Sequence, residues 1–332
     1  MSASNELRDL FHSFESKNII VIGDVMVDSY IIGKVERISP EAPVPVVSVY
    51  KRYSRLGGAA NVALNIKSLG ANPILCSLVG KDAKGDEFIS LLENENLAIN
   101  GIVFSNQRIT TTKYRVFGNT TQMLRVDEET TAMLNKKDFN SLIEKLNFIL
   151  STTHIDAIIF EDYDKGIIDK RLVNFVTQIA KKSNIIVTVD PKKKNFKFYK
   201  NVTLFKPNFK ELCEGTNSNI SCNDLESINK IANKLLIDNN IDNIVVTLSE
   251  NGIMAIAKEE SFHFKAEIRN IADVSGAGDT VISTITTALV AGFSLKKAVH
   301  LANIAGGLVC EEVGVIPINK EKLLKEASKI II

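Results

Sequence analysis

Short apolar segments that alternate with helix-like segments constrain the fold of this chain more than any other feature of its sequence. The apolar segments are residues 18–23, 73–79, 156–162, 184–190 and 243–249. Most are rich in Ile and Val, as is typical of strands buried on both faces. Apolar residues at helical spacing fill 59–69 and 84–97. Repeated strand–helix pairs predict an α/β fold with a parallel sheet, helices on both of its faces, and a ligand site at the carboxyl ends of the strands.

Composition and charge narrow the class of protein. A chain of 332 residues with 45% hydrophobic residues can bury a large core, and we expect one domain over residues 1–332 although two average domains would also fit. Forty basic and thirty-nine acidic residues give a net charge of +1, which points away from nucleic acid and acidic membrane surfaces as partners. The sequence shows neither a leader nor the ~18 consecutive apolar residues of a membrane span, so we expect a cytoplasmic protein. Four scattered cysteines are typical of reduced, packed thiols.

Acidic residues stand at the ends of three predicted strands. These residues are Asp24, the pair Glu161 and Asp162, and Asp190. Each could simply be solvated at the rim of the sheet. Because parallel strands end at one edge, several acids there favour a binding or catalytic site.

A loop of small residues at 273–279, with the sequence DVSGAGD, precedes a long apolar helical segment. Small residues allow a tight turn with exposed backbone N–H groups, and the positive end of the following helix favours an anion there. A carboxylate beside an anion is electrostatically costly, but a base that removes a proton from a hydroxyl next to a phosphate must stand there. Asp279 is therefore a candidate general base, and a simple helix N-cap is the alternative.

Two further segments interrupt the strand–helix pattern. Residues 30–53 are rich in β-forming residues but contain Pro40, Pro43 and Pro45, which predicts an edge strand or exposed ribbon and excludes a central strand. Residues 110–127 alternate around Gly118-Asn119, which is a turn signal between two strands.

Several motifs resemble those of one enzyme family, the ribokinase-like (PfkB) carbohydrate kinases. The loop at 273–279 resembles the family's second signature, 208–211 its N-x-x-E motif, and 56–63 its glycine-rich first signature. The resemblance is narrower to the group that phosphorylates D-glycero-β-D-manno-heptose 7-phosphate. It is carried by residues 23–28, 37–46, 57–65, 112–115 and 190–192.

The resemblance implies a ribokinase-like sheet, a small β-lid built from 30–55 and 108–128, and transfer of phosphate from ATP. Asp279 would be the catalytic base, and the backbone amides of Gly276, Ala277 and Gly278 would stabilise the transferred phosphoryl group. The nucleotide would lie against Asn208, Phe209, Lys210, Glu211, Thr247, Ser249, Glu250, Gly252 and Asn303.

The resemblance also implies metal ions. Asn208 and Glu211 would hold Mg²⁺ through water, although the same spacing is that of a helix-capping box. Asp273 and Ser275 could place oxygen atoms around a monovalent cation such as K⁺. Val274 stands where many relatives have Thr, which leaves that cation site open. Asn303 could instead be an ordinary polar residue on a helix.

The sugar would bind to the N-terminal half of the chain. Its candidate ligands are Asp28, Arg37, Gly57, Gly58, Asn61, Lys113, Arg115, Arg125 and Asp162. A substrate that already carries a phosphate needs fixed positive charge, and arginine suits forked binding of phosphate. Of the four cations in this set we expect two to contact the substrate and the others to be solvated.

These features predict phosphorylation of the heptose 7-phosphate at C1, giving the 1,7-bisphosphate used for ADP-heptose and surface-glycan precursors. Another sugar kinase of the same fold, or an inactive sugar or nucleotide sensor, are the alternatives. The H-x-G-H motif of a nucleotidyltransferase domain is absent, so we expect a stand-alone kinase. The lid is expected to pair with the lid of a second copy. The apolar residues expected on that face are Ile31, Ile32, Val44, Val46 and Val47.

Overall fold

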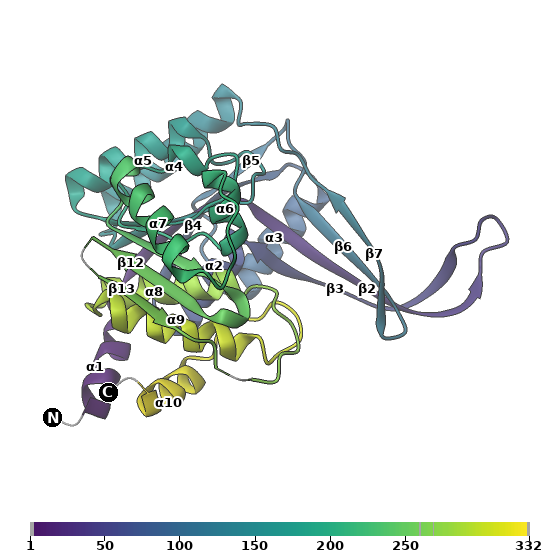
Figure 1. Cartoon of the computed structure of the whole chain (residues 1–332). Helices are drawn as coiled ribbons and strands as arrows, with labels where there is room; N and C mark the ends of the chain where they lie inside the picture. Colours follow the sequence, from purple (N-terminus) through teal and green to yellow (C-terminus); the bar gives the residue numbers. More distant parts are fainter. Residues whose placement is uncertain (1–2, 259, 268, 331–332) are drawn as a thin grey trace.

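The computed structural model describes residues 3–258, 260–267 and 269–330, in which the strands form two separate sheets (Figure 1). The ends of the expected domain, residues 1–2 and 331–332, lie outside this described part. The larger sheet has the strand order β13-β12-β11-β10-β9-β8-β1-β4-β5. Its strands are β1 (Asn18–Gly23), β4 (Asn72–Gly80), β5 (Ile102–Ser105), β8 (Ala157–Glu161), β9 (Ile186–Asp190), β10 (Leu204–Phe205), β11 (Asn243–Thr247), β12 (Ile253–Ala257) and β13 (Ser261–Phe264).

The central part of this sheet is parallel, as the sequence predicts, and β12 and β13 extend it in antiparallel fashion. In the register of the parallel strands Gly23 lies opposite Glu161, and Glu161 lies opposite Asp190. The two acidic strand ends therefore meet at one edge of the sheet.

Helices cover both faces of the larger sheet and enclose two apolar cores (Figure 1). One core contains residues of α1 (Ala3–Ser13), α2 (Ala59–Leu69), α3 (Ala83–Asn94), α8 (Ala277–Val290), α9 (Leu295–Val309) and α10 (Lys320–Ile330). The other contains residues of α4 (Lys136–Thr152), α5 (Lys170–Ser183), α6 (Phe209–Thr216) and α7 (Leu225–Asn239). Short 3₁₀ turns occupy Phe14–Ser16, Phe196–Phe198 and Ser249–Asn251.

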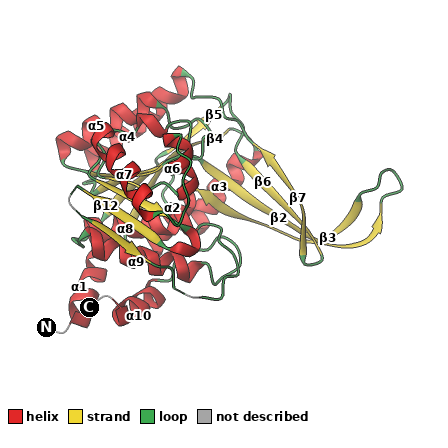
Figure 2. Cartoon of the chain, viewed as in Figure 1, coloured by secondary structure: helices red, strands yellow, loops and turns green. Residues whose placement is uncertain are grey.

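The smaller sheet projects from the body as a curved ribbon (Figure 2). Its order is β3-β2-β6-β7, with β2 (Val25–Ile38), β3 (Pro45–Gly58), β6 (Thr112–Gly118) and β7 (Thr121–Glu128). We call these four strands the lid. A turn with Asn119 at a positive φ of 59° joins β6 to β7, as predicted.

The expectation that prolines exclude a central strand from 30–53 is wrong for its first part. β2 is an interior strand of the lid, because it pairs with β3 on one side and with β6 on the other. Pro40 and Pro43 lie in the connection beyond the end of β2, and Pro45 begins β3, which is an edge strand. The prolines therefore lie at the tip of the ribbon, outside β2, whose pairing with β3 shifts register after Ile32 and after Val35.

Candidate active site

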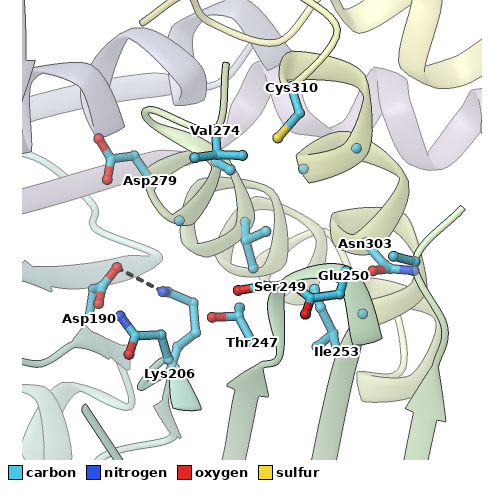
Figure 3. A pocket seen from close by; sticks show the side chains of 18 of the residues that line it. Asp190, Lys206, Thr247, Ser249, Glu250, Ile253, Val274, Asp279, Asn303 and Cys310 are labelled. Carbon is cyan, nitrogen blue, oxygen red and sulfur yellow. Dashed lines mark ion pairs between the residues drawn. The ribbon is translucent and has the colours of Figure 1, made fainter. Parts of the chain in front are cut away.

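A cavity of about 460 Å³ lies where the carboxyl ends of β9, β10 and β11 face the start of α8 (Figure 3). In Figure 3 Asp279 and Asp190 stand at one end, and Glu250 and Asn303 stand at the other. The candidate residues that line this cavity are Asn208, Glu211, Thr247, Ser249, Glu250, Gly252, Ala277, Gly278, Asp279 and Asn303. The structure thus brings together candidate catalytic and nucleotide residues that are up to 95 positions apart, from 208 to 303.

Two of the candidate nucleotide residues point elsewhere. Phe209 packs against the apolar core on the side of α7. Lys210 is exposed and pairs with Glu214 one turn later at 3.9 Å. Their side chains therefore do not line the cavity beside Asn208 and Glu211, because a helix places neighbouring side chains on different faces.

The small-residue loop ends in a tight turn that starts α8. Gly276 is the N-cap residue with φ of 80°, a left-handed conformation that favours glycine. A side chain at 276 would also lie 3.0 Å from Asn61 Nδ2. Asp273 fixes the other end of the loop, because its carboxylate accepts from the N–H groups of Ser275 at 2.9 Å and Gly314 at 3.0 Å. Ala277 and Gly278, at the start of α8, line the cavity, and the Ala277 N–H donates to the Val274 carbonyl at 3.3 Å within the loop.

Asp279 lies in the first turn of α8 and is buried, and two side chains donate to its carboxylate. Asn61 Nδ2 donates to Oδ2 at 2.7 Å, and the Tyr163 hydroxyl donates to Oδ1 at 2.9 Å. Burial raises the pKa of Asp279 to about 6, and these hydrogen bonds oppose that rise. A carboxylate with a pKa near neutrality can take up a proton during a reaction, which suits a general base.

Two more acids stand beside Asp279. One carboxylate oxygen from each of Glu161, Asp190 and Asp279 lies within 4.8 Å of the others. Lys206, only 2% exposed, neutralises part of this charge by pairing with Asp190 at 2.8 Å (Figure 3). Such a trio has donor atoms suited to a divalent cation. A bound cation would hold Asp279 in its ionised form and compete with proton uptake, so a base at Asp279 and a metal on the trio exclude each other.

Of these three acids, Glu161 has the fewest partners to offset the cost of burying its carboxylate. It is fully buried, and within the described part of the chain neither of its carboxylate oxygens has a hydrogen-bond partner. Burial, together with the charges of Asp190 and Asp279, raises the pKa of Glu161 well above its usual value. The folded protein therefore favours the protonated form.

Glu161→Gln is expected to stabilise the protein increasingly as pH rises. A carboxyl group whose pKa is raised by folding ionises in the unfolded chain first. It therefore lowers the free energy of unfolding increasingly as pH rises from its unfolded pKa of about 4.3 toward its folded pKa. Gln is neutral throughout, so the melting temperature of Glu161→Gln minus that of the wild type should increase between pH 5 and pH 9, by about 2–4 °C for each kcal/mol. Thermal unfolding across this range measures it, and a pH-independent difference would contradict the buried proton.

Asn208 and Glu211 form a capping box at the start of α6. Asn208 Oδ1 accepts from the Glu211 N–H, and Glu211 Oε2 accepts from the Asn208 N–H, both at 2.8 Å. Lys192 pairs with the other Glu211 oxygen. The capping role predicted as an alternative is therefore confirmed, and a metal at Glu211 would share or displace the Lys192 contact.

The candidate sugar residues form a charged strip at the root of the lid. Arg115 pairs with the buried Asp28 at 2.5 Å. Lys113 pairs with Asp127 at 3.3 Å, and Asp127 also holds Arg125 at 3.0 Å. These cations are thus held by acids of the lid in this structure, which fixes their direction before any ligand arrives.

The remaining sugar candidates are dispersed. A Cβ at Gly57 would lie 2.3 Å from a carboxylate oxygen of Asp28, so only glycine fits there. Gly58 has φ of 61°. Asn61 contacts Asp279. Arg37 lies at the distal end of the lid, opposite Val46 in the register.

Asp162 is directed into the protein. Its carboxylate accepts from Asn195 at 2.9 Å, from the Tyr199 hydroxyl at 2.7 Å and from the Asp164 N–H at 2.8 Å. Burial raises its pKa to about 7. Asp24, also expected at the site edge, accepts three backbone N–H groups of the loop after β8. Burial places both acids inside the protein, where they fasten a loop.

Three residues of the site escaped the sequence analysis. Tyr163 follows an acid pair that was noted, but nothing in the sequence joins it to Asp279. Lys206 precedes the N-x-x-E motif by two residues, which was the only available signal. Arg55, in β3, donates to the Val315 carbonyl at 3.1 Å and lies over Tyr30 and Tyr53, so it links the lid to the segment beside the anion loop.

Comparison with known proteins identifies the family. A model described as pfkB family carbohydrate kinase matches residues 16–322. The chain is a pfkB family carbohydrate kinase. Membership makes the protein a sugar kinase and implies ATP as the phosphate donor together with a divalent metal.

Relatives of this kinase are longer. The bifunctional protein HldE of Methylobacillus flagellatus is 39% identical over 93% of the chain, and HldE of Helicobacter pylori J99 is 38% identical over 90%. The chain spans 62% and 64% of these two relatives.

Solved structures confirm the ribokinase-like fold of the kinase. Phosphofructokinase-2 from Escherichia coli in complex with potassium has a TM-score of 0.77 at 21% identity, covering 94% of this chain and 99% of that one. Ribokinase from Arabidopsis thaliana complexed with ribose and ATP has a TM-score of 0.72 at 17% identity, covering 93% and 99%.

Proposed function

We propose that this kinase transfers the γ-phosphate of ATP to C1 of D-glycero-β-D-manno-heptose 7-phosphate, giving the 1,7-bisphosphate. The observation that carries the proposal is the position of Asp279. It stands at the start of α8, at one end of the cavity, with its carboxylate held by two donors, and one of these, Asn61, belongs to α2, the helix that directly follows lid strand β3. The motifs at 37–46 and 112–115, and 38–39% identity to the HldE relatives, support the heptose as substrate.

In this proposal Asp279 takes the proton of the C1 hydroxyl as that oxygen attacks the γ-phosphorus, and the bond from the γ-phosphorus to the bridging oxygen breaks, so that ADP leaves with the electron pair. The backbone amides at Gly276, Ala277 and Gly278 stabilise charge on the transferred group, and losing one such donor costs roughly 3–4 kcal/mol in comparable sites. Lys206 is buried within reach of the same loop, since a Cβ at Gly278 would lie 3.7 Å from its Nζ. We add it to the groups that neutralise the phosphoryl charge.

The nucleotide occupies the remaining length of the cavity. Thr247, Ser249, Glu250 and Gly252 line the wall that follows β11, and Asn303 of α9 stands at the far end, where its Nδ2 donates to the Lys265 carbonyl at 2.8 Å. We place the adenosine part of ATP along this wall and the phosphates near α8.

The divalent metal is best placed at the N-x-x-E motif. Asn208 and Glu211 offer oxygen atoms at the wall of the cavity, and Mg²⁺ usually keeps several waters between itself and such ligands. Asp273 and Ser275 remain candidates for a monovalent cation, because Asp273 already gathers backbone groups at that end of the loop. Bound metal would neutralise charge on the phosphates.

The C7 phosphate of the sugar is assigned to Lys113 and Arg115. Both lie on the same face of the lid as Asp28, which is left to bind sugar hydroxyls together with the backbone at Gly57 and Gly58. Arg125 neighbours Arg115 across β6 and β7 and could add charge. Arg37 and Asp162 lie apart from this group.

An ADP-release assay over free and phosphorylated sugars tests the proposal. Turnover with heptose 7-phosphate should exceed turnover with neutral sugars by a wide margin. A kinase that prefers a neutral hexose or pentose would overturn the heptose assignment, and ATP binding without turnover of any sugar would favour the sensor.

We propose that the chain acts as one kinase domain in the cytoplasm, where ATP is available. Residues 30–55 and 108–128 supply the lid that covers the sugar. Within the described residues no helix has both the length and the apolar character needed to cross a membrane. All four cysteines are free thiols, which is compatible with a reducing compartment.

We expect a homodimer formed through the lid. Of the residues expected on its face, Val44 is exposed and the other four are half-buried. The lid exposes further apolar side chains, which are Ile38, Val49, Tyr50, Met123, Leu124 and Val126. An apolar patch of this kind is typical of an interface.

Light scattering should give twice the chain mass of 36.6 kDa at micromolar protein. Leu124→Lys, which places a charge on a side chain that is 56% exposed, should lower the mass toward one chain. Ile237→Lys on α7, at 79% exposure, is the matched control and should leave the mass unchanged. A wild-type protein with the mass of one chain would contradict the dimer.

A further inference from the structure

Tyr163 contacts the proposed base although it lies 116 positions away in the sequence. We propose that Tyr163 is a positioning residue whose hydroxyl holds Asp279 in the orientation needed to take the proton of the acceptor hydroxyl. The inference rests on the proposed kinase function and concerns a residue that neither the motifs nor the family match singles out.

The geometry at Asp279 supports an orienting role. Tyr163 and Asn61 donate to different oxygens of the carboxylate, at 2.9 Å and 2.7 Å. Two donors on opposite oxygens restrict rotation of the carboxylate about its bond to Cβ. Each oxygen can accept more than one hydrogen bond, so both donors can remain while a substrate hydroxyl binds.

The loop that carries Tyr163 is fastened from below by a buried carboxylate. Asp24 accepts from the N–H of Tyr163 at 2.9 Å and from those of Lys165 and Ile167, both at 3.1 Å. Asp162, the preceding residue, is held by Asn195 and Tyr199. A loop with this many buried bonds gives its side chains a defined direction, as a positioning residue needs.

The surroundings keep the Tyr163 hydroxyl in its donor form. Burial, with the nearby charges of Asp279, Glu161 and Asp190, raises the pKa of Tyr163 well above its usual value. Lys192 lies over the ring, with Nζ 5.4 Å from its centroid. The phenol therefore stays neutral wherever Asp279 is ionised.

The pH dependence of activity should report the pKa of Asp279, which is set by the groups that face its carboxylate. Burial and the charge of Asp190 at the end of β9 raise its pKa, while the donors Asn61 and Tyr163 and the charge of Lys206 after β10 lower it. Glu161 at the end of β8 also has a carboxylate oxygen within 4.8 Å of Asp279. Removing the Tyr163 hydroxyl withdraws one group that favours the ionised form. The pKa of Asp279 must then rise from about 6, so activity is lost at a higher pH as the medium is acidified.

Tyr163→Phe tests the inference because it removes one oxygen and keeps the ring. We expect kcat to fall by about tenfold or more, as for loss of a hydrogen bond to a charged group. The midpoint of the acid limb should move toward neutral pH, while KM for ATP stays within about twofold. Thr177→Val is the control, since it removes one buried hydroxyl that donates to the Val173 carbonyl at 2.8 Å on α5, outside the site. This control should leave both kcat and the midpoint unchanged.

The outcomes separate this inference from the proposed function. A wild-type protein without turnover of any sugar phosphate would remove the kinase proposal itself. An active wild type whose Tyr163→Phe variant keeps its acid midpoint and kcat would overturn the positioning role. A variant that loses melting temperature and kcat but keeps the midpoint would assign Tyr163 to structure only, and also overturns the inference.

Discussion

Replacing Asp279 by Asn is expected to lower turnover by about 10² or more, the range supplied by general bases. The amide has nearly the size of the carboxylate but cannot take a proton at neutral pH. Binding of ATP should change little, because the same substitution removes a negative charge beside the phosphates. Steady-state kinetics at saturating sugar and ATP measure the first effect, and the dissociation constant for ATP measures the second.

The contacts of Asp279 indicate that this variant will fold. Asn61 can keep its bond to the amide oxygen, and the Tyr163 hydroxyl can rotate to accept from the amide NH₂ group. Asp224→Asn is a matched control, since Asp224 is an exposed N-cap of α7 and Asn caps helices equally well. A folded Asp279→Asn variant with more than about a tenth of wild-type turnover would show that Asp279 is not the base.

The sequence was enough to predict the fold because its signals are local. The segment 18–23 and the helix at 59–69 have the boundaries that were predicted, and the others differ by a few residues. Lys84–Leu97 was expected to be helical, yet α3 ends at Asn94, since the chain turns at Asn96 with φ of 50°. Helix ends depend on such single turns more than on periodicity.

The acids at the strand ends show where sequence reasoning stopped. All four were expected at one edge, and parallel register does align Glu161 with Asp190. Asp24 and Asp162 nevertheless turn inward and bind backbone or buried side chains. The direction of a side chain after a strand depends on the path of the following loop, which no periodic pattern encodes.

The contacts of the lid cations are a second feature that the sequence could predict only in part. Lys113, Arg115 and Arg125 were predicted as candidate phosphate ligands by resemblance alone. Asp127 lies opposite Lys113 across the antiparallel β6–β7 hairpin, which the turn at Gly118-Asn119 predicted. The contact of Arg115 with Asp28 instead depends on the parallel pairing of β2 with β6, between segments 85 residues apart. A pairing of that range follows from the tertiary fold and cannot be read from local sequence.

Those ion pairs sharpen the prediction for the sugar phosphate. Lys113→Ala combined with Arg115→Ala removes two charge-assisted hydrogen bonds, each worth roughly 1.5–3 kcal/mol. KM for heptose 7-phosphate should rise at least tenfold, while KM for ATP stays near the wild-type value. Salt should weaken sugar-phosphate binding of the wild type more than that of the variant, because screening acts on the charges that were removed.

The same structure supplies the control that this experiment needs. Removing Arg115 leaves the buried Asp28 carboxylate without its partner, which lowers stability whatever the ligand. Lys34→Ala combined with Arg52→Ala removes two exposed cations from the lid and should leave both KM values unchanged. If the Lys113 and Arg115 variant melts earlier and loses affinity for ATP and sugar together, the two cations only support the lid. An unchanged KM for heptose 7-phosphate in the folded variant would reject this phosphate site and leave the kinase assignment in place.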